Sequence, residues 1–85
     1  RVSAWFGAFL PLQGGWIYHS DLGWVYTVDD GAGNLWLWRE GQGWLWTGQG
    51  IYRYLYRPQD QSWIYFLARK NGQPHFYNYA TGTVE

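Results

Sequence analysis

One pattern recurs along this chain: an aromatic–aliphatic–aromatic triplet, a mostly polar stretch that ends in glycine, and a second triplet of the same kind. Residues 16–26 read WIYHSDLGWVY, and residues 36–46 repeat this arrangement as WLWREGQGWLW. Side chains that alternate with a period of two are typical of a β-strand. Trp, Tyr, Val and Ile are also residues that favour strands. Each copy of the pattern therefore predicts one β-hairpin.

Two less regular copies follow. The third, 54–65, reads YLYRPQDQSWIY, and starting it at position 54 rather than 55 gives it a loop that is one residue longer. The fourth, 75–85, is degenerate: Gly82 and Val84 keep the register, whereas Thr83 replaces the tryptophan. The sequence predicts a single domain, 1–85, with repeats at about 16–35, 36–53, 54–74 and 75–85.

The repeats predict an all-β domain, an antiparallel meander of about nine short strands without a helix. Because the connections are short, sequential strands should pair with each other. Residues 4–10 add a lone N-terminal strand, which can complete the last repeat by pairing with it. An open meander leaves two unpaired edges, which natural proteins avoid or protect. We therefore expect the four hairpins to close into a small shallow barrel or ring; the alternative is a linear β-hairpin solenoid.

Glycine precedes the second triplet in three of the repeats, at Gly23, Gly43 and Gly82. A hairpin loop that closes with a bulge needs a residue with positive φ, which glycine adopts without a Cβ penalty. We expect positive φ values at these glycines. Ser62 stands at this place in the third copy, which leaves the geometry of that loop open.

The alternation divides each hairpin between two faces. The central aliphatic residues share one face, and the flanking aromatic residues share the other. We expect the aliphatic residues to line the interior and the aromatic residues to pack between neighbouring hairpins, although the period alone leaves the opposite assignment open. The expected interior residues are Ile17, Val25, Leu37, Leu45, Leu55, Ile64 and Val84.

The composition limits both the fold and the partners. The chain has no cysteine, so disulfides and thiolate metal sites are excluded. Its 8 Trp, 8 Tyr and 4 Phe supply the bulk that a small core needs. Six basic and six acidic residues give zero formal net charge. This balance argues against a nucleic-acid partner, whose affinity comes largely from cations on phosphate. No stretch reaches the ~20 apolar residues of a transmembrane helix. We therefore expect that this chain is not an integral membrane protein.

Residue types that carry catalysis are scattered along the sequence. His19 and His75 occupy non-equivalent positions, and neither has a second ligand at metal spacing. Asp21, Glu40 and Asp60 fall in three separate hairpin loops, whereas a glycosidase needs two carboxylates about 5–9.5 Å apart across a cleft. We therefore predict no catalytic residue, no metal site and no cofactor in a protein that is not an enzyme.

The aromatic face is the candidate binding surface. Its rings exceed what one thin domain can hide, and a large exposed aromatic patch usually marks an interaction surface. The ordinary alternative is that the rings only form the core. Exposed rings stack on sugars or hold quaternary ammonium groups; the expected ligands are carbohydrate or an apolar, lipid-like molecule in a central pore. The predicted binding residues are Trp24, Trp44 and Trp63, which follow the loops, and Tyr26, Trp46 and Tyr65, two positions further on.

The units WIYH…LGWVY and LWLW…GWLWT resemble an aromatic-rich domain at the C-terminal ends of large bacterial surface proteins. They are also similar to the β-flower fold, a shallow symmetric barrel with hairpins around a hydrophobic centre, and the likeness spans about residues 4–85. It implies a binding or anchoring module of a larger secreted or cell-surface protein; the first residue, Arg1 rather than Met, leads us to expect an excised piece. A structural C-terminal end-cap or protein-interaction domain without a small ligand is the alternative. Gly23-Trp24 and Gly43-Trp44 also resemble, more weakly, choline- and glucan-binding cell-wall repeats.

Overall fold

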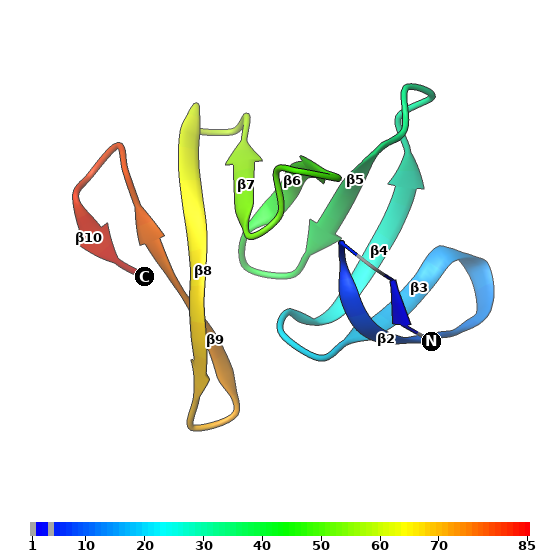
Figure 1. The fold of residues 1–85 in the computed structure, drawn as a ribbon. Coiled ribbons are helices and arrows are strands. Elements are labelled where there is room, and N and C mark those ends of the chain that lie inside the picture. Colours follow the sequence, from blue (N-terminus) through cyan, green and yellow to red (C-terminus); the bar gives the residue numbers. More distant parts are fainter. Residues whose placement is uncertain (1, 4) are drawn as a thin grey trace.

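The computed structural model describes residues 2–3 and 5–85. These residues form ten β-strands in one antiparallel sheet, and every strand pairs with its neighbours in the sequence (Figure 1). One 3₁₀ turn, η1 (Gln13–Gly15), is the only helical segment within the described residues. The predicted all-β antiparallel meander is therefore confirmed. The strands are β1 (Val2–Ser3), β2 (Gly7–Pro11), β3 (Trp16–His19), β4 (Gly23–Asp29), β5 (Asn34–Arg39), β6 (Gly43–Gly48), β7 (Tyr54–Arg57), β8 (Ser62–Lys70), β9 (Gln73–Asn78) and β10 (Thr83–Val84).

Four hairpins follow one another, and we number them in chain order: β3–β4, β5–β6, β7–β8 and β9–β10. In the first hairpin His19 pairs with Gly23, which leaves residues 20–22 in the loop. In the third hairpin Arg57 pairs with Ser62, which leaves residues 58–61. The longer third loop that the sequence predicts is thus confirmed.

The loop glycines have the backbone conformation that we expected. The φ angles of Gly23, Gly43 and Gly82 are 79°, 77° and 69°. In the third hairpin the left-handed residue is Gln61, with φ 54°. In this longer loop the left-handed conformation therefore falls one residue earlier in the chain, on the last loop residue. Ser62 begins β8 without a positive φ.

The register of the fourth hairpin differs from our expectation. Thr83 pairs with Asn78, and Val84 pairs with Tyr77. Val84 therefore stands where the other hairpins carry a tryptophan, and it is 59% exposed on the outer face. The predictions that Val84 faces the interior and that Thr83 replaces the tryptophan are wrong. The loop between Asn78 and Thr83 is one residue longer than in the first two hairpins, and a one-residue shift turns every following side chain to the opposite face.

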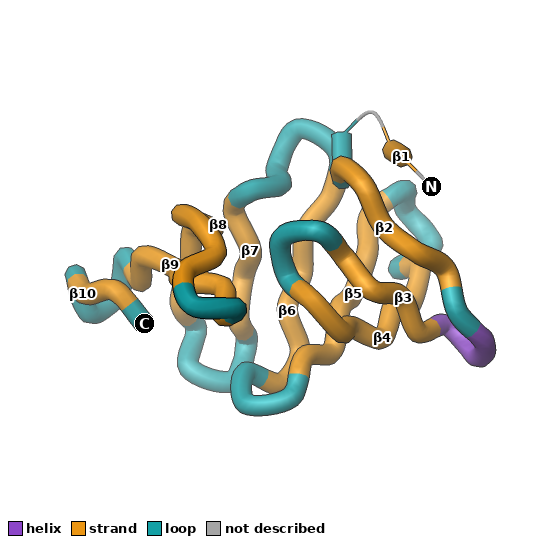
Figure 2. The backbone as a smooth tube through the Cα atoms, turned by 90° about the horizontal axis from the view of Figure 1, so that it is seen from below, coloured by secondary structure: helices purple, strands orange, loops and turns teal. Residues whose placement is uncertain are grey.

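The sheet is open, so the expected closed barrel or ring is not supported. Its strand order runs from β1 to β10 without returning to the start. The N-terminal strand β2 pairs with β3 instead of the last hairpin, because the short turn η1 folds it directly back onto its neighbour; residue 4 of the predicted strand lies outside the described residues. Figure 2 shows the strands from β2 to β7 curling around a central space, with the β3–β4 loop at its middle.

The core lies on the inner face of this curl. Each of the first three hairpins places two aliphatic residues directly opposite each other: Ile17 and Val25, Leu37 and Leu45, Leu55 and Ile64. All six are buried, which confirms that the aliphatic face points inward. The remaining buried hydrophobic residues are Phe6, Leu22, Phe66 and Phe76.

The β3–β4 loop fills the centre of the curl. Leu22, the last residue of this loop, is buried. The Asp21 carbonyl accepts a hydrogen bond from Arg69 Nη1 at 3.0 Å, and its carboxylate accepts one from the Tyr52 hydroxyl at 2.9 Å. Arg39 Nε donates to the Leu22 carbonyl at 3.1 Å. Side chains from three distant segments thus hold one loop, and they connect parts of the sheet that strand pairing leaves apart.

His19 is a structural cap of this loop. Its Nδ1 accepts hydrogen bonds from the backbone N–H groups of Asp21 and Leu22 at 3.0 and 3.2 Å. Its Nε2 lies 2.6 Å from the Phe6 carbonyl oxygen, which can only accept, so Nε2 carries the proton and the ring is neutral. Asn78 has the same role in the fourth hairpin, where its Oδ1 accepts from two backbone N–H groups.

This geometry predicts that the domain loses stability in mild acid. Burial lowers the pKa of His19 despite the opposing effects of the Phe6 carbonyl and Asp21. The unfolded state therefore binds the proton more readily, so stability is complete above the ordinary histidine pKa and falls as the pH drops below about 6.5. Chemical denaturation across this window measures the loss. His19→Asn keeps an acceptor at the capping position and should flatten the profile; an equal slope in this variant would contradict the assignment.

Candidate functional site

The outer face of the sheet carries the aromatic residues in cross-strand pairs. Each of the first three hairpins contributes two such pairs, on either side of the inward-facing aliphatic pair. Cross-strand neighbours of this kind are the main units of side-chain contact in a sheet. The pairs are Trp16–Tyr26 and Tyr18–Trp24, Trp36–Trp46 and Trp38–Trp44, and Tyr54–Tyr65 and Tyr56–Trp63.

The tryptophans that follow the loops remain open to solvent. Trp24 is 59% exposed, and Trp44 and Trp63 are each 41% exposed. Neighbouring rings meet them edge-on: Trp36 contacts Trp44 at a centroid distance of 6.5 Å and an angle of 90°, and Trp46 contacts Trp63 at 6.5 Å and 74°. Such contacts are favourable between aromatic rings. They fix the orientation of each ring and make the surface corrugated instead of flat.

Three shallow grooves lie between these rings, and each contains one of the three tryptophans. Their volumes are about 390, 370 and 510 Å³, at the lower end of the size of small-molecule sites. We name them after the tryptophan that each contains. The Trp24 groove is lined by Trp16, Trp24, Trp38 and Glu40; the Trp44 groove by Val28, Trp36, Trp44 and Pro58; and the Trp63 groove by Gly50, Ile51, Tyr54, Trp63 and Tyr79.

The three grooves are built from equivalent positions. Each contains the aromatic residue that begins its own hairpin, which is Trp16, Trp36 or Tyr54. Each also contains the tryptophan that follows the loop and the first loop residue of the next hairpin. The register explains this convergence: Trp46 pairs with Tyr56, so Trp44, two positions back, faces the first residue of the third loop. One local pattern therefore produces three similar sites along the sheet.

The first loop residue makes the grooves chemically different. It is Glu40 in the Trp24 groove, Pro58 in the Trp44 groove and Tyr79 in the Trp63 groove. In the Trp63 groove the Tyr79 hydroxyl forms a hydrogen bond with Tyr54, which raises the pKa of Tyr79. The grooves thus offer a carboxylate, an apolar surface and a pair of hydroxyl groups beside similar indole rings.

The six residues predicted to bind a ligand do not form one cluster. Trp24, Trp44 and Trp63 line separate grooves. The other three are partly buried and support neighbouring rings: Tyr26 lies 6.5 Å from Trp44, Trp46 lies 6.5 Å from Trp63, and Tyr65 lies 4.7 Å from Tyr54. Trp46 also donates from Nε1 to the Asp30 carboxylate at 3.1 Å.

Ten groove residues were missing from our sequence-based set, and six of them occupy positions that recur in all three grooves. Three are the first aromatic residues of the hairpins, Trp16, Trp36 and Tyr54; three are the first loop residues, Glu40, Pro58 and Tyr79. The repeat itself marks the second group, because each of these loop residues directly follows the first strand of its hairpin. Using that signal required the register between neighbouring hairpins, which the repeat within one hairpin does not define.

Comparisons with known proteins give no match. No family model matches the chain, and neither a search of curated proteins nor one of solved structures finds a similar protein. The function of this chain therefore has to be inferred from its own sequence and geometry.

The structure also bears on metal binding and on membrane spans. Within residues 2–3 and 5–85, no group of three or more His, Cys, Asp or Glu side chains is placed to hold a metal ion. Among the helical segments of the same residues, none is long and apolar enough to cross a membrane. Two of the three loop carboxylates have structural partners: Asp21 binds the Tyr52 hydroxyl, and Asp60 pairs with Arg57 at 2.8 Å.

Proposed function

We propose that this chain is a non-catalytic binding module that holds a carbohydrate chain on its outer aromatic face. The observation that carries this proposal is the presence of three grooves at equivalent positions, each lined by the solvent-exposed tryptophan that follows a hairpin loop. A ligand that repeats along its length can occupy several such sites at once. Linked sites of modest affinity then give strong binding overall, because the second and third contacts are intramolecular.

Carbohydrate suits the chemistry of these grooves. The C–H face of a sugar ring can cover an exposed indole, and covering about 40 Å² of apolar surface contributes about 1 kcal/mol. Hydroxyl groups of the sugar need polar partners, which the rims offer as the Glu40 carboxylate and the Tyr54 and Tyr79 hydroxyls. The aromatic rings are already held by edge-on neighbours, so little side-chain ordering opposes binding.

An apolar, lipid-like ligand is the second candidate, and the Trp44 groove favours it. This groove is lined by Val28, Trp36, Trp44 and Pro58. All four side chains present mainly apolar atoms, so an acyl or other apolar group would bury surface without leaving its polar groups unpaired. The ligand would lie in the outer groove, since the inner face of the sheet is occupied by the core side chains.

The proposal also places the module at a cell surface, as part of a larger secreted bacterial protein. This part rests on the resemblance of the hairpin units to aromatic-rich domains of surface proteins. A structural end-cap or a protein-interaction domain that binds no small ligand is the competing function.

Binding assays on soluble ligands test the proposal. The panel contains neutral polysaccharides (a β-glucan, xylan and dextran), a uronate polysaccharide, and phosphatidylcholine vesicles as the lipid probe. We expect saturable binding to at least one polysaccharide, accompanied by a change in tryptophan fluorescence. Trp44→Ala should weaken it by roughly fivefold, since about 1 kcal/mol is lost.

Trp5→Ala is the matched control, because Trp5 packs against the core beside Phe6 and lines none of the three grooves. This variant should bind like the parent chain once its folding is verified by circular dichroism. Binding to vesicles alone would favour the lipid-like ligand. A folded chain that binds no member of the panel would contradict the proposal and support the end-cap.

A further inference from the structure

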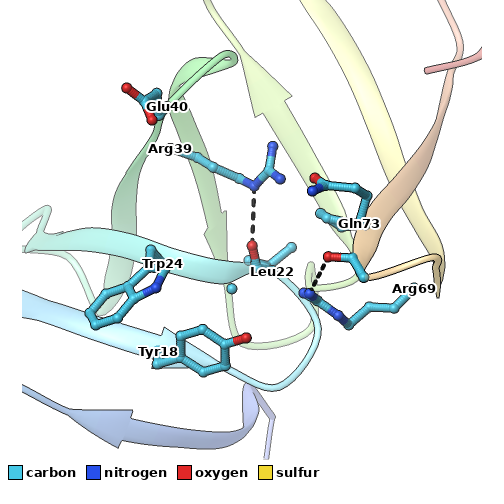
Figure 3. Close-up of a pocket in the computed structure, with 10 residues that line it drawn as sticks. Tyr18, Leu22, Trp24, Arg39, Glu40, Arg69 and Gln73 are labelled. Atoms are coloured by element: carbon cyan, nitrogen blue, oxygen red, sulfur yellow. Dashed lines mark hydrogen bonds between the residues drawn. The ribbon is translucent and has the colours of Figure 1, made fainter.

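A pocket beside the Trp24 groove contains two arginines. Its volume is about 360 Å³, and we call it the arginine pocket. Figure 3 shows Arg39 and Arg69 extending into it from different strands, with Tyr18 and Trp24 on one side and Gln73 on the other.

The two guanidinium groups have no carboxylate partner within the described residues. Arg39 donates to the Leu22 carbonyl and to Gln42 Oε1, both at 3.1 Å. Arg69 donates to the carbonyls of Asp21 and Gly72 at 3.0 and 2.6 Å. These acceptors are neutral, so both positive charges remain uncompensated. Burial, and then the charge of Arg69, lower the pKa of Arg39.

Arg57 shows the contrast within the same chain. It forms ion pairs with Asp60 at 2.8 Å and Glu85 at 2.6 Å, so two of the six acidic residues compensate one arginine. Glu40 lies on the rim of the arginine pocket, but its carboxylate is not within ion-pair distance of either arginine and points away from them in Figure 3. The chain as a whole has zero formal net charge, but the arginine pocket therefore carries a local excess of positive charge.

Trp24 connects the arginine pocket with the proposed sugar-binding face. Together with Glu40, it lines both the pocket and the Trp24 groove. A sugar ring that covers this indole would place its substituents at the mouth of the pocket. Guanidinium groups bind carboxylates through charge-assisted hydrogen bonds, and their planar fork matches the two carboxylate oxygens.

We propose that the arginine pocket binds the carboxylate of a uronic acid unit in a polysaccharide whose ring stacks on Trp24. This inference rests on the proposed carbohydrate function and makes it specific for acidic polysaccharides. Arg39 Nη2 forms no hydrogen bond with the described residues and is one donor for the carboxylate; Arg69 supplies the second positive charge.

A matched pair of polysaccharides tests the charge directly. Polygalacturonate and its methyl ester have the same sugar backbone, but only the first carries free carboxylates. We expect polygalacturonate to bind at least about tenfold more tightly, as for a charge-assisted hydrogen-bonded pair. Arg69→Gln should remove this preference, and Trp24→Ala should weaken binding of both polymers.

Arg53→Gln is the matched control variant. Arg53 also donates to backbone carbonyls, those of Phe66 and Leu67, but it does not line the arginine pocket. It should therefore lose similar structural contacts while keeping the preference for polygalacturonate. Thermal unfolding of both variants verifies that they fold. If Arg69→Gln does not, the parent chain still tests carboxylate recognition, and Trp24→Ala tests the site, because Trp24 is exposed and lines the arginine pocket.

Several results would overturn the inference. Equal binding of both polymers by the parent chain would exclude carboxylate recognition, and a preference kept by a folded Arg69→Gln variant would exclude this pocket. Equal binding of poly-L-glutamate would show recognition of a carboxylate without a sugar. Absence of binding to any uronate polymer would also overturn it. In that case, binding to the neutral polysaccharides decides separately whether the proposed carbohydrate function holds.

Discussion

Replacing Leu37 by alanine is expected to lower the free energy of unfolding by about 3 kcal/mol. Leu37 is fully buried, pairs across the sheet with Leu45, and belongs to the core on the inner face. The loss combines the transfer free energy of the deleted methyl groups with the cost of the cavity that they leave. In a domain of this size it corresponds to a decrease in Tm of roughly 12–24 °C, which thermal unfolding measures.

Leu67→Ala provides the control with the same chemical change. Leu67 lies on β8 at the bulge between Phe66 and Ala68, and it is 41% exposed. Its truncation leaves no closed cavity, so the expected loss is below about 1 kcal/mol. Equal losses for the two variants would contradict the assignment of the inner aliphatic face as the core.

Simultaneous replacement of Trp24, Trp44 and Trp63 by alanine should have the largest effect on ligand binding. Each ring contributes about 1 kcal/mol when a sugar covers it, so the affinity for the polysaccharide should fall by roughly a hundredfold. The inner core contains none of these residues, so the variant should keep its fold. Affinity electrophoresis or calorimetry measures the change, and circular dichroism measures the fold.

The three single variants distinguish a shared ligand from one dominant groove. Because the grooves occupy equivalent positions, we expect each single replacement to weaken binding by a comparable factor. Loss of all binding from one replacement, with no effect of the other two, would indicate one small-molecule site instead of three. Unchanged binding in the triple variant would exclude the aromatic face as the site.

The hairpins could be predicted from the sequence because each depends on local features. The alternation of Ile17 between Trp16 and Tyr18, for example, requires one face to be aliphatic and the other aromatic. Burial of Ile17 and exposure of Tyr18 follow from that pattern once the core side is known. The conformations of Gly23 and Gly43 also follow locally, from the needs of a short loop.

Errors arose where one residue decides the register. The loop after Asn78 contains one more residue than the loop after His19, so Val84 lies on the outer face. Nothing in the degenerate fourth unit distinguishes these two loop lengths. The prediction of a closed barrel failed for a different reason. The β3–β4 loop, with buried Leu22 and the hydrogen bonds to Asp21, occupies the centre of the curl. The general avoidance of unpaired sheet edges does not predict such a loop.

The binding grooves required contacts between hairpins. The sequence singles out Trp24, Trp44 and Trp63 because they recur, but each groove is completed by a residue from the following hairpin, such as Glu40 or Pro58. The arginine pocket is harder still to foresee. Arg39 and Arg69 are thirty positions apart in the sequence, and only the position of the β3–β4 loop between them brings both to one pocket.

The most direct test of the account follows the side-chain N–H signals of the eight tryptophans by NMR during titration with a uronate polysaccharide. If the outer face is the binding surface, the signals of Trp24, Trp44 and Trp63 shift together with increasing ligand. The signal of Trp5, which packs against the core away from the grooves, stays in place. A titration in which only Trp5 shifts, or in which binding moves none of the three groove tryptophans, would contradict the account.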